Sequence, residues 1–320
     1  MDPQRISRKI VLAGGTGQIG QILQRAFVRA GDEVVVLSRS ANGPHELAWD
    51  GRKLGAWALA IDGADAVVNL AGRTVNCRYT EANLKEMLDS RVDSTRVIGE
   101  AVARASRPPR VWLQMSTATL YAHTFGPAHT ETTGVLGGNE PGVPAYWRRS
   151  VEIGLAWEAA LAAAPTPHTR KVALRTSMVM SPDRGGILDV LSGLTRAGLG
   201  GPVAGGRQYV SWIADVDLVT AFELLLRRED ISGPINVCAP EPLPQRELMA
   251  ALRCAWGRPI GLPATSWMAE LGAWLLRTDT ELLLKSRRVV PERLLQVGMN
   301  FALPRWAEAA PALVARFDRR

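Results

Sequence analysis

Three evenly spaced glycines join an apolar run to a helical pattern near the start of the chain. The run is Ile10-Val11-Leu12-Ala13, and the loop is Gly14-Gly15-Thr16-Gly17-Gln18-Ile19-Gly20. In such a strand–loop–helix unit the first glycine allows a tight turn, the second lets the backbone approach a pyrophosphate, and the third lets the helix pack on the strand. The spacing, Gly-x-x-Gly-x-x-Gly, is a variant of the commoner fingerprint. It predicts a dinucleotide site at Gly14, Thr16, Gly17, Gln18, Ile19 and Gly20.

The next strand predicts which dinucleotide binds there. Residues 33–37 form an apolar strand pattern, and Ser38-Arg39-Ser40 follow it directly. An acidic residue at this strand end accepts the 2′-hydroxyl of NAD, whereas an arginine pairs with the 2′-phosphate of NADP. A charge-assisted contact of this kind contributes roughly 1.5–3 kcal/mol. Ser38 and Arg39 therefore favour NADP(H).

Strands and helices alternate through the first half of the chain. Strand patterns recur at 64–72, 111–116 and 171–176, and helical patterns at 79–105 and 146–164. This alternation predicts an α/β fold of the Rossmann type, a doubly wound parallel sheet with right-handed crossovers. The carboxyl ends of the strands then meet at one cleft. We expect four residues at two of these strand ends to contact the cofactor: Leu70, Ala71, Gly72 and Ser116.

The alternation of strand and helix patterns stops beyond residue 178. Glycine pairs at 185–186 and 205–206 and a glycine-rich stretch at 198–202 break the chain into short elements. Helical patterns return at 266–277, 279–285 and 305–316. We expect a Rossmann domain at 1–178, completed by about 212–238, and a smaller substrate and C-terminal lobe at 179–211 and 239–320.

Composition and charge exclude several classes of protein. A hydrophobic content of 47% is too high for a disordered chain. The net charge of +7 comes without a basic tract interleaved with aromatics, which argues against a nucleic-acid partner. The chain shows neither a membrane-spanning apolar stretch nor a signal peptide, so we expect a cytoplasmic protein without a membrane partner. The three cysteines are widely spaced and indicate neither disulfides nor a metal site.

Six motifs together resemble a known family. They lie at 14–20, 69–72, 90–95, 116–121, 157–158 and 206–213. The chain resembles the extended short-chain dehydrogenase/reductases, and more narrowly their atypical branch described as NAD-dependent epimerase/dehydratase-like. Members of that branch end in a small C-terminal domain of unknown function, and residues 271–273, 284–291 and 298–301 are similar to it.

The resemblance implies roles for several side chains. It places Thr117 where a hydroxyl residue bonds the reacting oxygen, and Arg91 where a cofactor-facing asparagine is usual. Arg207 resembles a substrate-phosphate arginine of the second lobe. With Gln208 and Trp212 it is expected to line a pocket for a small-molecule substrate, for which an anionic group is one option.

The usual catalytic pair of this superfamily is missing. Ordinary members use Tyr-x-x-x-Lys, in which the lysine lowers the pKa of the tyrosine that moves the proton. Tyr146 is the one tyrosine in the right segment, and Ser150 stands four residues after it. If Glu158 is instead matched to the glutamate that often follows the lysine, the pair becomes Ser150 and Gly154. Either register loses the lysine.

Three explanations remain open. Tyr121 replaces the missing acid, with Arg91 or Arg149 stabilising its phenolate; or the protein binds NADP(H) and a second ligand without turnover, as a sensor or scaffold; or its reaction needs less acid–base help. We predict an NADP(H)-dependent oxidoreductase with Thr117, Tyr121 and Tyr146 as candidate catalytic residues. A non-catalytic NADP(H)-binding protein and a nucleotide-sugar epimerase or dehydratase are the alternatives. The long helices at 79–105 and 144–164 offer an interface for a homodimer.

Overall fold

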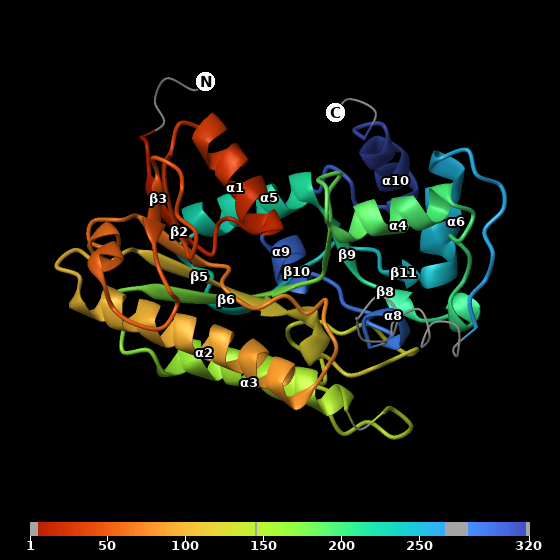
Figure 1. Ribbon diagram of the computed structural model, residues 1–320, viewed down its shortest axis with the longest axis horizontal. Helices are drawn as coiled ribbons and strands as arrows, with labels where there is room; N and C mark the ends of the chain where they lie inside the picture. Colours follow the sequence, from red (N-terminus) through yellow and green to blue (C-terminus); the bar gives the residue numbers. More distant parts are fainter. Residues whose placement is uncertain (1–5, 145, 266–280, 318–320) are drawn as a thin grey trace.

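A seven-stranded parallel sheet forms the centre of the computed structural model, which describes residues 6–144, 146–265 and 281–317 (Figure 1). The strands lie in the order β10-β6-β5-β4-β1-β2-β3, and every pairing is parallel. Their bounds are β1 Lys9–Ala13, β2 Glu33–Ser38, β3 Glu46–Ala48, β4 Ala66–Asn69, β5 Val111–Thr117, β6 Arg170–Thr176 and β10 Gly233–Val237. This arrangement confirms the expected doubly wound Rossmann fold.

The five central strands coincide with the apolar runs of the sequence, because strands buried on both faces read as continuous apolar segments. The two edge strands have weaker patterns. β3 has only three residues, two of them exposed, and β10 falls in the segment expected to complete the domain.

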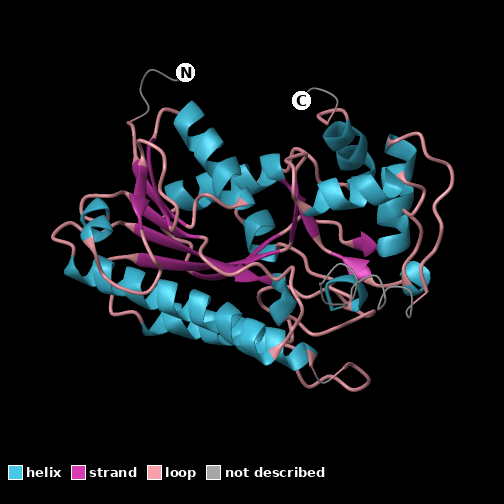
Figure 2. Cartoon of the chain, viewed as in Figure 1, coloured by secondary structure: helices cyan, strands magenta, loops and turns pink. Residues whose placement is uncertain are grey.

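Helices cover both faces of the sheet (Figure 2). On one face lie α1 Gln18–Arg29 and α5 Asp215–Arg227, and on the other α2 Glu81–Arg104 and α3 Trp147–Ala163 (Figure 1). α2 begins where the Thr80 side chain accepts a hydrogen bond from the backbone N–H of Asn83, and it ends shortly before Pro108. The expected helices at 79–105 and 146–164 are thus confirmed to within two residues at each end.

The smaller lobe is built from short elements around its own core. It contains α4 Ile187–Arg196, α6 Gln245–Ala255 and α10 Trp306–Val314, with two-stranded pairings of β7 Met178–Met180 to β9 Trp212–Ala214 and of β8 Tyr209–Val210 to β11 Leu243–Pro244. Trp212, Leu248 and Trp306 are buried together in it. Two further short helices, α8 Glu281–Leu284 and α9 Glu292–Gln296, precede α10 in the chain, and α9 packs against β10.

The helix expected at 305–316 is α10. The helix expected at 266–277 and the motif at 271–273 lie outside the described residues; of the segment 279–285, Glu281–Leu284 is helical. Within the described ranges, no helix is long and apolar enough to cross a membrane.

Candidate functional site

The glycine loop leaves space that side chains would otherwise fill. Gly14 has a φ of +73°, and a Cβ there would lie 2.9 Å from the backbone of Ala71. A Cβ at Gly20 would lie 2.2 Å from the carbonyl oxygen of Gly15, whereas one at Gly17 would meet only the Gly14 carbonyl, at 3.7 Å. Gly14 and Gly20 are therefore required for packing, and Gly17 leaves open space in front of the loop.

The N-terminus of α1 faces this space. Gly17 occupies the N-cap, and no side chain of the described residues caps it. The first N–H groups of a helix carry a partial positive charge and bind anions readily. The loop and helix therefore fit a pyrophosphate, as the sequence predicts.

Ser38 and Arg39 stand beside the loop at the end of β2. The backbone N–H of Gly14 donates to the carbonyl of Leu37 over 2.9 Å, and the Thr16 and Ser38 hydroxyl oxygens lie 3.5 Å apart. Ser38 is buried, whereas Arg39 is exposed next to it. The guanidinium is thus accessible to a phosphate at the rim of the cleft.

A buried amide network shapes the end of β4. The Asn69 side chain donates to Gln114 Oε1 over 3.0 Å and accepts from the backbone N–H of Ala71 over 3.0 Å. This fixes the turn at 70–72 behind Gly14. Leu70 and Gly72 then face the cavity described next, while Ala71 packs against Gly14.

A cavity of about 260 Å³ lies between the carboxyl ends of the strands, α2, α3 and the C-terminal segment. Six of the residues expected to form the site line it: Ile19, Leu70, Gly72, Arg91, Ser116 and Thr117. α3 contributes Ser150, Gly154 and Trp157, and the C-terminal segment contributes Glu281 and Arg287. The strand ends, two helices of the first domain and the C-terminal lobe therefore share one cavity.

Ser150 and Gly154 occupy the cavity wall where the missing pair is expected. Tyr146 is 41% exposed at the N-cap of α3 and is not among the lining residues. A Cβ at Gly154 would lie 2.7 Å from Leu120 Cδ2 and 3.4 Å from Thr117 Cγ2. The geometry therefore matches the register defined by Glu158, and Leu120 fills the space in which a lysine side chain would start.

Tyr121 lies outside the cavity, in the core. It is 1% exposed, stacks on His129, and its hydroxyl donates to Asn236 Oδ1 over 2.8 Å. Burial raises its pKa, although Arg175 opposes the shift. Arg175 is the arginine that contacts this phenol, over 3.1 Å. The Tyr121 hydroxyl therefore makes a hydrogen bond within the core, and the side chain does not line the cavity.

Neither of the two arginines expected to assist Tyr121 is hydrogen-bonded to its hydroxyl: Arg91 lines the cavity, and Arg149 lies on α3. Arg149 points to the surface, where it lies 3.5 Å from Glu81 and 3.6 Å from Glu152. Glu158 is held by two hydrogen bonds from Arg175 and one from Ser116, over 2.6–2.9 Å. The Ser116 hydroxyl is thus held by Glu158, and Ser116 and its neighbour Thr117 both line the cavity.

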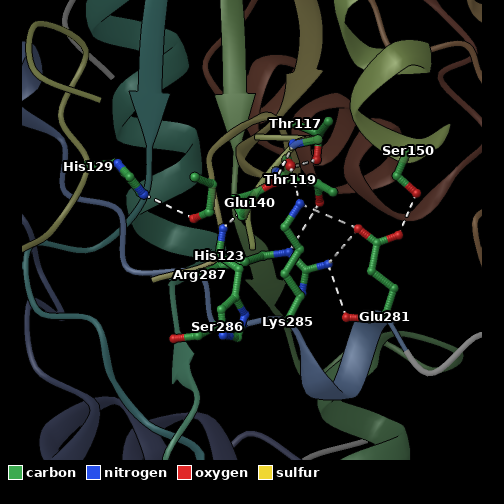
Figure 3. Close-up of polar contacts among 12 residues, drawn as sticks. Thr117, Thr119, His123, His129, Glu140, Ser150, Glu281, Lys285, Ser286 and Arg287 are labelled. Carbon is green, nitrogen blue, oxygen red and sulfur yellow. Dashed lines mark hydrogen bonds and ion pairs between the residues drawn. The ribbon is translucent and has the colours of Figure 1, made fainter. Parts of the chain in front are cut away.

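The sequence analysis missed a carboxylate on the cavity wall (Figure 3). Ser150 Oγ donates to Glu281 Oε2 over 2.5 Å, and Lys285 Nζ lies 3.6 Å from Glu281 Oε1. Lys285 is 2% exposed and donates to the carbonyl of Thr119 over 2.9 Å, while Arg287 lies 4.0 Å from Glu281. The sequence contains a signal for this pair: Glu281 stands four residues before Lys285 in an apolar stretch, and residues at this spacing share one face of a helix.

Two histidines hold this C-terminal segment against the first domain. His123 Nδ1 accepts from the backbone N–H of Ser286 over 3.0 Å, and the Ser286 hydroxyl donates to the carbonyl of Thr124. The backbone of His129 pairs with Arg288 and Val290. Burial lowers the pKa of both histidines and of Lys285. The network therefore favours neutral imidazoles.

The three residues predicted to bind substrate do not line the cavity. Arg207 is exposed. The Gln208 amide is buried and donates to the carbonyls of Val203 and Leu283. Trp212 is 0% exposed and packs edge-on against Trp306, with ring centroids 4.9 Å apart. The burial of Gln208 and Trp212 contradicts the expectation that they line a substrate pocket, because the Gln208 amide donates to two backbone carbonyls and the Trp212 ring packs against Trp306. The role expected of the exposed Arg207 stays a prediction.

Comparison with known proteins identifies the family. The NAD dependent epimerase/dehydratase family model matches residues 10–238. The chain belongs to this family. A second model, a domain of unknown function (DUF1731), matches residues 264–313. The resemblance to the atypical extended short-chain dehydrogenase/reductases is thereby confirmed.

Relatives of this family match nearly the whole chain. The human epimerase family protein SDR39U1 is 30% identical over 310 residues, which cover 96% of this chain and 100% of that protein. The epimerase family protein ML0860 of Mycobacterium leprae is 31% identical over 306 residues, 92% of each chain.

Solved structures agree with this assignment. The crystal structure of human SDR39U1 (isoform 2) with NADPH has a TM-score of 0.83 and 27% identity, over 96% of this chain and 99% of that one. A nucleoside-diphosphate sugar epimerase from Corynebacterium glutamicum has a TM-score of 0.73 and 27% identity, over 97% of this chain and 59% of that one.

Proposed function

We propose that the protein is an NADP(H)-dependent oxidoreductase acting on a small molecule bound in the cavity. The observation that carries this proposal is the shared wall: Ile19 of the glycine loop and the hydroxyl-bearing Thr117 and Ser150 line the same cavity. A hydride donor and a group that binds the reacting oxygen must meet in such a space.

The first domain supplies the cofactor site. The space in front of Gly17 and the uncapped start of α1 fit the pyrophosphate, and the exposed Arg39 fits a 2′-phosphate. The NADPH in the human SDR39U1 structure supports the same choice. When bound, the nicotinamide supplies or accepts the hydride.

Thr117 and Ser150 act on the reacting oxygen. The Thr117 hydroxyl oxygen accepts from the backbone N–H of Thr119, which leaves its proton to be donated into the cavity. Ser150 takes the place of the usual tyrosine. Glu281 accepts its hydrogen bond, and Lys285 stabilises that carboxylate from 3.6 Å. Ser150, Glu281 and Lys285 thus connect a hydroxyl, a carboxylate and an ammonium group for holding and moving a proton.

This arrangement favours oxidoreduction over nucleotide-sugar epimerisation. Epimerisation needs a competent base in addition to hydride transfer, and the family resemblance suggests one particular arginine for the substrate phosphate. Arg207, which the family resemblance suggests for that purpose, is exposed and not among the lining residues.

The test is a titration of the purified full chain with NADPH and with NADH, followed by nicotinamide fluorescence. Arg39→Ala is expected to weaken NADPH binding roughly ten- to a hundredfold, from loss of one charge-assisted contact, and to leave NADH nearly unchanged. Arg29→Ala is the matched control, since this exposed arginine lies at the other end of α1. Equal losses in the two variants, or binding of neither nucleotide, would contradict the cofactor assignment.

Turnover is tested afterwards. A screen of small aldehydes and ketones with NADPH should find an acceptor whose reduction falls roughly a hundredfold or more in Ser150→Ala and Thr117→Val. NADPH binding without reduction of any acceptor would favour the sensor or scaffold alternative.

A further inference from the structure

Arg91 brings a cation into the cavity without an acidic partner among the described residues. Its Nη1 donates to the carbonyl of Met87 over 2.9 Å, and its guanidinium lies 4.9 Å from the centre of the Trp157 ring. No carboxylate in the described ranges lies within 4.0 Å of it. A Cβ at Gly72 would lie 3.2 Å from Arg91 Cζ, so the guanidinium is also packed against the turn at 70–72.

Two other arginines packed inside the protein, Arg8 and Arg175, are each paired with a carboxylate. Arg8 lies 2.5 Å from Asp32, and Arg175 lies 2.8 Å from Glu158. A cation removed from water is unfavourable unless an anion compensates it. Consistent with this, burial lowers the pKa of Arg91 to about 10. An arginine held in this way is ready to bind an anion.

Among the described residues, the cavity wall carries more positive than negative side chains. Arg91 and Arg287 both line it, against one carboxylate, that of Glu281, which also lies near Lys285. Thr117 and Ser150 line the same cavity as Arg91. One molecule can therefore place an anionic group on Arg91 and its reacting oxygen on the hydroxyls.

We propose that Arg91 binds the carboxylate of the second ligand, and that the substrate is a small oxo or hydroxy acid. This rests on the proposed oxidoreductase function. A guanidinium presents parallel N–H donors that match a planar carboxylate, and the contacts of Arg91 with the Trp157 ring and the Met87 carbonyl hold the side chain in place. A cavity of about 260 Å³ suits a molecule of a few carbon atoms. Arg91 thus replaces Arg207 as the residue that recognises the substrate anion.

The experiment uses propionate as probe and the equally sized neutral propionamide as its control. The full chain, with and without saturating NADPH, is titrated with each at constant ionic strength, with thermal stability and tryptophan fluorescence as readouts. Propionate should bind and raise the unfolding temperature, and propionamide should not. Inorganic phosphate is titrated in parallel, to separate a carboxylate site from a phosphate site.

Arg91→Met is the decisive variant because it keeps the length of the side chain and its packing on Trp157. It should weaken propionate binding at least tenfold. Arg96→Met is the matched control, since Arg96 lies on the same helix, exposed and paired with Glu100. Arg91→Lys retains the charge but lacks the paired donors, so its affinity for propionate should lie between those of wild type and Arg91→Met. This variant replaces Arg91→Met in the test if Arg91→Met does not fold.

Several results would overturn the assignment. One is equal affinity of wild type and Arg91→Met for propionate, and another is binding of propionamide as tight as that of propionate. A response of the protein to phosphate alone, or to neither anion, would also contradict the proposal. Weakened NADPH binding in Arg91→Met with an intact propionate response would make Arg91 a cofactor contact. Because propionate is also titrated without NADPH, failure of the NADP(H) assignment is seen separately.

Discussion

Ser150 on α3 and Glu281 on α8 are joined by a hydrogen bond of 2.5 Å across 131 positions of the sequence. The bond connects the wall of the dinucleotide-binding domain to the C-terminal segment. It puts a carboxylate next to the hydroxyl that replaces the family's usual tyrosine. The wall of this cavity is thus completed by the C-terminal segment.

Breaking the buried pair Glu281–Lys285 should destabilise the protein strongly. Glu281→Gln leaves the buried ammonium of Lys285 uncompensated and should cost about 3–5 kcal/mol of unfolding free energy. Glu281→Gln with Lys285→Met should cost less than the sum of the single variants, because the double variant removes the ammonium that Glu281→Gln leaves without its carboxylate. Urea unfolding measures all three.

The surface pair Lys85–Asp89 is the control for that cycle. Its atoms lie 2.6 Å apart but both side chains reach solvent, so Asp89→Asn should cost less than about 1 kcal/mol. A Glu281→Gln variant as stable as Asp89→Asn would show that the buried pair is not held as described.

Two glycines within helices should respond to alanine in opposite directions. Gly20→Ala places a Cβ 2.2 Å from the Gly15 carbonyl, so it should destabilise by about 1–3 kcal/mol and weaken NADPH binding. Gly193, inside α4, has nothing within 4 Å of an added Cβ, and Gly193→Ala should stabilise by about 0.5–1 kcal/mol. Chemical denaturation and NADPH titration of both variants check this; the same sign of change in both would disprove it.

Stability should fall as the pH is lowered below about 6.5. The pKa of His123 and of His129 is depressed in the folded state, so between the folded and unfolded values the unfolded chain binds protons that the folded chain does not. Each group then removes up to about 1.4 kcal/mol per pH unit in that window, and nothing above it. Protonation would also break two hydrogen bonds, because His123 Nδ1 accepts from the Ser286 N–H and His129 Nδ1 accepts from the Val135 N–H.

Urea midpoints between pH 5.5 and 8 measure this dependence. His129→Asn should flatten part of the slope, whereas His168→Asn, at an exposed position, should leave it unchanged. Identical slopes in these two variants would rule out His129 as a source.

Trp212 should matter for stability and not for ligand binding. Its ring is fully buried against Trp306, so Trp212→Ala should cost about 3–5 kcal/mol. At a temperature where the variant is folded, its affinity for NADPH and propionate should match that of wild type. A loss of affinity without a loss of stability would indicate that Trp212 contacts a ligand.

Features encoded within a few neighbouring residues could be predicted from the sequence. The glycine loop, the central strands and α2 are examples, because apolar periodicity, capping and glycine spacing act locally. Six residues predicted from the strand ends and the family motifs line the cavity, since parallel strands bring their carboxyl ends to one edge. The absence of the Tyr/Lys pair was equally plain from the chain.

What replaces that pair was decided by tertiary structure. Tyr121 and Trp212 were expected to face a ligand, but both rings are buried: the Tyr121 hydroxyl donates to Asn236, and the Trp212 ring packs edge-on against Trp306. Glu281 reached Ser150 only because the second domain folds back over the cleft. Sequence alone determined the sheet and the dinucleotide loop through short-range preferences. Only the packing of distant segments determined which polar groups were satisfied internally and which, like Arg91, were left facing the cavity.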